Sequence, residues 1–148
     1  MNKRFMLTAA GAAATGFAGT ASAVVVNWTH GLDRWAGEHS WQVYDANSSV
    51  VASMAIVSNY ITYGGAAIST AVTSYSTSTA HLFDIHGTMS LASGTYNVQM
   101  QDSYGDGWGW GSYVGGLAIG SGSATCSGGS ASFSFTVAGV PAHFCDLG

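Results

Sequence analysis

A short glycine-rich segment concentrates the side chains that could bind a ligand. Residues 101–113 read QDSYGDGWGWGSY, with four glycines in seven positions, and such glycines let a backbone turn sharply and approach a ligand closely. Asp102 and Asp106 lie four positions apart in this turn. Together with the backbone carbonyl of Tyr104, they supply the hard oxygen ligands that Ca²⁺ prefers. The sequence therefore predicts a calcium site at Asp102, Tyr104 and Asp106.

The same two aspartates also have a simpler interpretation. Aspartate and glycine are ordinary turn residues, and an aspartate side chain often accepts hydrogen bonds from the backbone of its own turn. The segment lacks the D-x-D-x-D-G spacing and the closing glutamate of an EF-hand. A purely structural turn is therefore the alternative to calcium binding.

Four aromatic side chains in or beside this segment are candidate ligand-binding residues: Tyr104, Trp108, Trp110 and Tyr113. Aromatic rings on a glycine-rich loop can stack on the faces of sugars or anchor a protein partner. The alternative for one of the two tryptophans is core packing, with Trp108 closing the end of the core. Trp110 is the better candidate for an exposed ring.

Residues 102–108, DSYGDGW, carry a family resemblance. They are similar to the D-S-Y-G-D-G-W motif of β-sandwich modules in secreted bacterial and algal proteins, where such modules accompany extracellular peptidases and adhesion domains. Residues 94–96 and 116–119 resemble the strands on either side of the motif, and residues 38–43 resemble the E-x-S-W-x-hydrophobic opening. The resemblance covers roughly 38–137, and after the motif Gly-Trp-Gly replaces the usual Asn-Gly. It implies an accessory, non-catalytic module and names no ligand.

The elements that must position this loop are all β-strands. Short runs of β-branched and aromatic residues alternate with Gly, Ser and Asn breaks, and no window shows a sustained helical period. Alternation is clearest in residues 96–100 and 133–137, whereas residues 57–80 are weakly patterned and could slip or form loops. The expected strands lie near 24–28, 40–45, 50–56, 58–63, 67–75, 79–86, 94–101, 113–119 and 131–138. Eight or nine short strands predict an all-β fold, an antiparallel two-sheet sandwich or a jelly-roll-like variant of it.

The first residues have the layout of a secretory signal peptide. Lys3 and Arg4 precede an uncharged apolar stretch that ends at the small-x-small site Ala21-Ser22-Ala23. An N-terminal anchor helix is the alternative. We therefore expect a signal peptide at 1–23, one β-sandwich domain at 24–138 and a C-terminal tail at 139–148. The mature chain is expected outside the cell or on its surface, without a transmembrane segment.

The two cysteines fit this location. An even cysteine count in an exported chain favours a disulfide, which would join Cys126 to Cys145 and hold the tail. Two free thiols, or thiols paired between molecules, are the alternative.

Charge is scarce, and this excludes several classes of partner. Once the signal is removed, Arg34 is the only strong base, seven carboxylates remain, and the net charge is −6. A chain with one strong base cannot neutralise a row of phosphates, so neither nucleic acid nor an anionic membrane is an expected partner. A surface rich in Ser, Thr, Gly and Ala instead suits neutral sugars, and it also permits close self-association.

The sequence offers little catalytic machinery. Five histidines are scattered along the chain: His30, His39, His81, His86 and His143. Asp84 and His86 are expected to share a strand face, but neither an H-E-x-x-H nor a G-x-S-x-G motif is present. A small secreted hydrolase is therefore the least supported class. We expect a secreted binding or adhesion module whose loop, with calcium as a candidate cofactor, meets a glycan or a surface protein. A self-assembling subunit of an extracellular fibre or matrix is the alternative.

Overall fold

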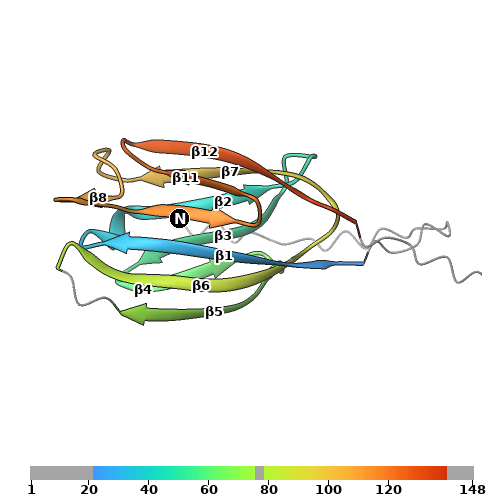
Figure 1. The fold of residues 1–148 in the computed structure, drawn as a ribbon, viewed down its shortest axis with the longest axis horizontal. Helices are drawn as coiled ribbons and strands as arrows, with labels where there is room; N and C mark the ends of the chain where they lie inside the picture. Colours follow the sequence, from blue (N-terminus) through green and yellow to red (C-terminus); the bar gives the residue numbers. More distant parts are fainter. Residues whose placement is uncertain (1–21, 76–78, 140–148) are drawn as a thin grey trace, which may run out of the picture.

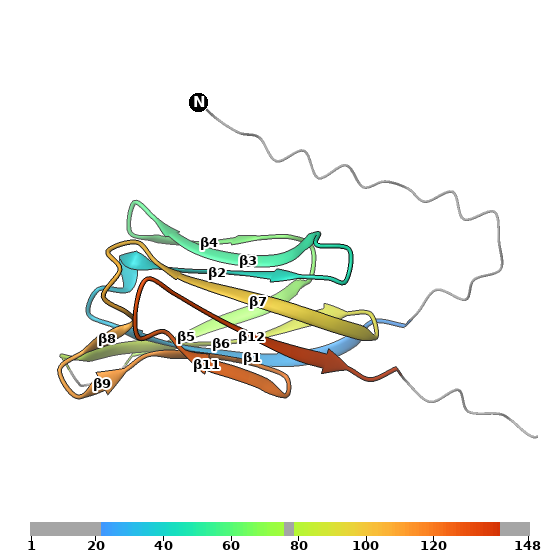
Figure 2. The same cartoon turned by 90° about the horizontal axis from the view of Figure 1, so that it is seen from above.

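Two antiparallel five-stranded sheets pack face to face in this computed structural model, which describes residues 22–75 and 79–139 (Figure 1, Figure 2). The first sheet has the order β11 (Gly122–Thr125), β10 (Gly116–Ile119), β1 (Val24–Asp33), β6 (His81–Leu91) and β5 (Ile68–Tyr75). The second has the order β12 (Ser130–Val137), β7 (Gly94–Asp102), β2 (His39–Tyr44), β3 (Val50–Val57) and β4 (Tyr60–Gly64). The short 3₁₀ helix η1 (Ala36–Glu38) precedes β2, and a small hairpin pairs β8 (Gly109–Trp110) with β9 (Tyr113–Val114). The predicted all-β sandwich is confirmed.

The alternation of the core strands explains the packing. In β7, Tyr96, Val98 and Met100 are all buried while the residues between them are exposed. The two sheets meet through large side chains, and the rings of Trp28 from β1 and Trp41 from β2 make an edge-on contact at 5.3 Å between centroids. Period-two patterning therefore forms one apolar layer between two wetted faces.

The described residues form more strands than expected. The expected strand at 113–119 is divided into β9 and β10 by Gly115, whose N–H bonds to the Trp108 carbonyl at 2.5 Å. β11 was not anticipated, because its sequence GSAT has no apolar alternation. The weakly patterned stretch at 57–80 supplies β4 and β5, which form the edges of the two sheets on one side of the sandwich. Edge strands bury less, and this accounts for their weak pattern.

The glycine-rich loop lies at one end of the sandwich, and the start of β1 and the end of β12 lie at the other. β8, β9 and η1 cluster at one end, whereas β1 begins and β12 ends at the other (Figure 1, Figure 2). The expected signal peptide and C-terminal tail fall almost wholly outside the described residues. None of the helical segments within the described residues is long and apolar enough to cross a membrane.

The expected disulfide is not present among the described residues. Cys126 is buried with a free thiol, which donates a hydrogen bond to the Gly128 carbonyl at 3.0 Å. Its expected partner, Cys145, lies outside the described residues. The Cys126–Cys145 bond therefore stays a prediction.

Candidate functional site

Asp102 is the last residue of β7 and continues the inward alternation of that strand. Its side chain is 6% exposed. One carboxylate oxygen, Oδ1, accepts hydrogen bonds from the backbone N–H groups of Tyr104 at 2.9 Å and Gly105 at 2.6 Å. The other oxygen, Oδ2, is buried without a hydrogen-bond partner. The structural turn expected for this aspartate is therefore present, but it engages only half of the carboxylate.

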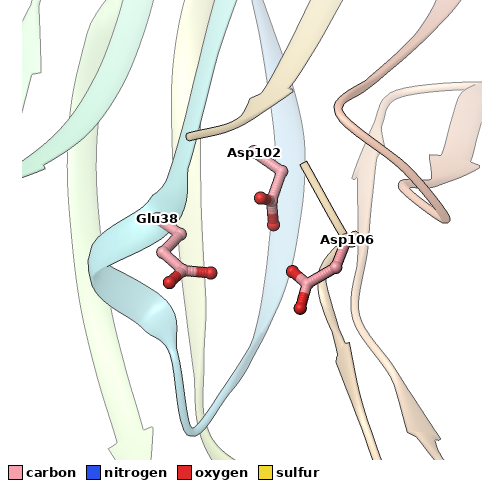
Figure 3. Close-up of side chains that lie close together, drawn as sticks. All are labelled: Glu38, Asp102 and Asp106. Carbon is pink, nitrogen blue, oxygen red and sulfur yellow. The ribbon is translucent and has the colours of Figure 1, made fainter. Parts of the chain in front are cut away.

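Two more carboxylates converge on Asp102. One oxygen from each of Glu38, Asp102 and Asp106 lies within 4.8 Å of the others, and Figure 3 shows the three side chains turned toward one another. Glu38 comes from η1, and its backbone carbonyl accepts a hydrogen bond from the Ser103 N–H at 3.0 Å. This hydrogen bond joins η1 to the segment that carries Asp102 and Asp106.

Sequence reasoning placed Asp102 and Asp106 here and missed Glu38. Its signal was present, because Glu38 is the only glutamate of the chain and opens the segment that resembles the family frame. The register of the second sheet pairs His39 with Asp102, which brings the preceding glutamate beside the motif. Tyr104, the third predicted calcium ligand, contributes a backbone N–H to Asp102, and its carbonyl as a metal ligand stays a prediction.

Burial and the neighbouring carboxylates raise the cost of ionising Glu38. The pKa of Glu38 is raised from its usual value, first by burial and then by the negative charges of Asp102, Asp106 and Asp33. Close like charges produce this effect because each disfavours the ionised form of its neighbour.

A surface cleft of about 320 Å³ adjoins the carboxylates and is lined by Trp35, Tyr104, Trp110, Glu38 and Asp106. The three aromatic side chains are exposed by 48%, 78% and 44% respectively. Trp35 and Trp110 meet edge to face at 6.0 Å between centroids. Trp35 was not anticipated as a site residue, since it is remote from the glycine-rich segment in sequence.

Arg34 makes cation–π contacts with both tryptophans of this cleft. Its guanidinium lies 5.5 Å from the ring centroid of Trp35 and 5.2 Å from that of Trp110. Such cation–π contacts are worth about 0.5–1 kcal/mol at exposed sites. The strongest base of the domain therefore helps to hold the cleft aromatics in place.

Trp108 corrects one of the predicted ligand contacts. It is fully buried, its ring stacks on His39 at 4.4 Å between centroids, and its Nε1–H donates to the Gln101 carbonyl at 3.0 Å. A ring enclosed in this way has no face left for a ligand, so Trp108 closes the end of the core, as its alternative interpretation proposed. Trp110 is exposed in the cleft, as expected.

Tyr113 also lies outside the cleft lining. Its ring is half-buried and stacks on His81 at 4.2 Å between centroids. Burial and the nearby charges of Asp84 and Asp33 raise the pKa of Tyr113 to about 12. Of the four predicted ligand-binding aromatics, the structure therefore brings Tyr104 and Trp110 together in the cleft.

The second glycine of the motif is required by its surroundings. Gly107 has a φ of +99°, and a Cβ at this position would lie 2.7 Å from the carbonyl oxygen of Cys126. The next residue, Trp108, donates its backbone N–H to the same oxygen at 2.8 Å. Only glycine fits this combination of left-handed backbone and close approach, so the motif glycine serves to seat Trp108.

A buried chain of polar side chains lies beneath Trp108. His30 Nε2 and His39 Nδ1 are 3.1 Å apart, and His39 Nε2 is 3.1 Å from Asp33 Oδ1, which also accepts the Trp35 N–H at 2.9 Å. Burial lowers the pKa of His39 to about 3, and burial together with His39 lowers the pKa of His30 well below its usual value. Sequence reasoning missed this chain, although inward alternation in β1 and β2 places both histidines on the core face.

Asp84 and His86, which were expected to share a strand face, contact other partners. Asp84 Oδ1 contacts His81 Nε2 at 2.8 Å, and His86 Nε2 contacts Ser74 Oγ at 3.3 Å. The register between β1 and β6 shifts at Asp33, which pairs with His81, and such a bulge breaks strict alternation. His81 and Asp84 therefore meet although they are three positions apart.

No protein-family model, curated protein or solved structure matches the chain. The likeness of residues 102–108 to the D-S-Y-G-D-G-W motif therefore stays a resemblance. The case for a functional site rests on the carboxylate cluster and the adjoining cleft.

Proposed function

We propose that this protein is a secreted, non-catalytic binding or adhesion module that acts outside the cell or at its surface. Its binding site is the aromatic cleft of Trp35, Tyr104 and Trp110, and its partner is a glycan or a surface protein. Calcium, held beside the cleft, is the proposed cofactor. The cleft is the observation that carries this proposal, because it joins exposed rings to fixed carboxylates in one hollow.

The chemistry of the cleft favours a glycan. Sugar rings present apolar C–H faces to aromatic rings and hydroxyl groups to polar neighbours, and tryptophan and tyrosine combine a large apolar face with a polar handle. Glu38 and Asp106 provide hydrogen-bond acceptors at the edge of the aromatic surface. A neutral, hydroxyl-rich ligand satisfies both kinds of group.

The placement of the cleft also supports a binding role. The cleft residues lie in η1 or directly before it, in the loop after β7, and in β8. These segments lie at the end of the sandwich opposite to the point where β1 begins and β12 ends (Figure 2). A module joined to a surface or to another domain through its terminal strands would present the cleft outward.

Trp110→Ala is expected to weaken glycan binding about tenfold or more, because aromatic anchors dominate such sites. The measurement is a glycan array with the purified protein, followed by titration of the best ligand monitored by tryptophan fluorescence. Tyr60→Ala is the matched control, since Tyr60 is 77% exposed and lies on β4, away from the cleft residues. Equal binding by native protein and Trp110→Ala would reject the cleft as the site. Capture of surface proteins without any glycan would identify the other kind of partner.

A fibre or matrix subunit is the second candidate, favoured by one edge of the sandwich. β4 and β5 end their sheets on the same side, and these two edge strands expose Tyr60 and Val72 by 77% and 66%. Unpaired edge strands with exposed apolar side chains can pair with those of another molecule.

The assembly candidate predicts association that depends on protein concentration. Light scattering on column fractions is expected to show high-mass species in the native protein and fewer of them in Val72→Lys, because a charge on an edge strand opposes pairing. A monomer at every concentration up to the millimolar range would reject this function.

A further inference from the structure

The carboxylate cluster has an unusual imbalance around Asp102. Oδ1 of this buried side chain accepts two backbone hydrogen bonds, while Oδ2 has no hydrogen-bond partner. A buried charged oxygen without a partner is costly. Oδ2 belongs to a side chain that points between Glu38 and Asp106 (Figure 3), so the group that would satisfy it must also be compatible with two further carboxylates.

A divalent cation has the required chemistry and size. Ligand oxygens of a calcium ion lie about 2.3–2.6 Å from the metal, so two of them on opposite sides are separated by about 5 Å. The candidate atoms of Glu38, Asp102 and Asp106 lie within 4.8 Å of one another, which lets a single ion reach all three. Calcium suits the site better than magnesium, because calcium tolerates irregular geometry and mixed carboxylate binding modes.

The cluster cannot saturate such an ion. Calcium takes about six to eight oxygen ligands. Asp102 can offer Oδ2, because its Oδ1 is engaged by the backbone, and Glu38 and Asp106 can each offer one or two oxygens. Open positions therefore remain in the coordination shell. Glu38 and Asp106 also line the aromatic cleft, so the open positions face the space that the ligand would enter.

We propose that Glu38, Asp102 and Asp106 bind one calcium ion beside the aromatic cleft, and that vicinal hydroxyl groups of a neutral saccharide complete its coordination. This inference rests on the proposed function and names the ligand class and the cofactor dependence of the same site. Three carboxylates and one calcium ion leave a net charge of −1. The remaining negative charge disfavours an acidic sugar and favours a neutral one.

The first test measures the metal alone. Calorimetric titration of the purified protein with Ca²⁺ is expected to show one site, and Glu38→Gln is expected to weaken it about tenfold or more because the number of ligand charges sets calcium affinity. Asp45→Asn is the matched control. Asp45 Oδ1 also accepts two backbone N–H groups in its own turn, but Asp45 does not belong to the cluster. An absence of binding at millimolar Ca²⁺, or equal affinity in Glu38→Gln and native protein, overturns the inference.

The second test asks whether the ligand reaches the ion. Terbium replaces calcium and is excited through the cleft tryptophans, and its decay in H₂O and D₂O counts the water molecules bound to the ion. Addition of mannose, a neutral sugar with vicinal hydroxyls, or of the best neutral glycan from the array, is expected to lower this count in native protein. An unchanged count with bound glycan overturns the inference.

Chelation separates this inference from the proposed function. Glycan binding that disappears in EDTA and returns with Ca²⁺ supports both. Glycan binding that is undiminished in EDTA overturns the calcium bridge and leaves the aromatic cleft as the binding site. If no glycan binds with Ca²⁺ present while calorimetry shows the metal site, the proposed glycan function fails and the bridging role fails with it.

Discussion

Trp108→Ala is expected to lower the free energy of unfolding by about 3–5 kcal/mol, the usual cost of removing a large aromatic side chain from a core. Trp108 is fully enclosed, with its ring stacked on His39 and tilted against His30 at 4.6 Å between centroids. The substitution also removes the donor to the Gln101 carbonyl. Urea denaturation followed by far-ultraviolet circular dichroism measures the change. Small domains have only about 5–15 kcal/mol in total, so the variant would be marginally stable.

Trp110→Ala is the matched control for Trp108→Ala. The two tryptophans are two positions apart in the same segment, but Trp110 is 44% exposed and makes surface contacts with Trp35 and Arg34. We expect it to lower the free energy of unfolding by no more than about 1 kcal/mol. A similar loss from both variants would contradict the division between a core ring and a ligand-facing ring. Trp108→Phe retains a stacked ring and is expected to fall between native protein and Trp108→Ala.

The fold was predictable where one face of a strand is apolar. Tyr96, Val98 and Met100 gave a clear period of two, and β7 lies where it was expected. The first strand was expected to end near residue 28, yet β1 continues to Asp33. Its buried positions beyond Trp28 include the polar residues His30 and Asp33 beside Leu32, and both polar side chains contact His39. A hydropathy pattern along one strand does not show that a polar side chain will find a hydrogen-bond partner, here His39, on another strand.

The extension of β6 beyond its expected end at 86 has a similar cause. Gly87 is usually read as a strand breaker, but here it pairs with Trp28 across the sheet. A Cβ on Gly87 would lie 2.2 Å from the Trp28 ring. The glycine is therefore part of the strand because a large ring from the neighbouring strand occupies its face.

The candidate site was predictable only within one segment. Asp102, Asp106, Tyr104 and Trp110 were found because they are close in sequence and share a glycine-rich turn. Glu38 and Trp35, by contrast, reach the same place through pairing of β2 with β7. Nothing in the local sequence specifies that register. For a site assembled across strands, the sequence therefore identifies only the residues that share one segment.

The domain is expected to lose stability steeply as the pH falls from about 6.5 toward 4.5. His39, with a folded pKa of about 3, and His30, whose pKa burial lowers well below its usual value, remain neutral in the fold, whereas unfolded histidines take up a proton near pH 6.5. The unfolded chain therefore binds more protons, and stability decreases on acidification. Each histidine contributes up to about 1.4 kcal/mol per pH unit in this range. Urea denaturation from pH 7.5 to 4.5, in EDTA to exclude metal effects, measures the slope.

The neighbouring carboxylate has the opposite sign, so it reduces this slope over the pH range in which it titrates. The pKa of Asp33 is raised, mainly by burial. The folded protein therefore takes up a proton on Asp33 at a higher pH than the unfolded chain does. This uptake adds to the free energy of unfolding as the pH falls through the raised pKa. His30→Gln is the informative variant, because an amide N–H can replace the ring Nε2–H that faces His39 Nδ1 while no longer titrating. Its pH slope is expected to be shallower than that of native protein by the contribution of one histidine. A native slope near zero between pH 6.5 and 4.5 would show that the buried chain beneath Trp108 takes up protons without unfolding, and it would contradict the neutral state assigned to both histidines.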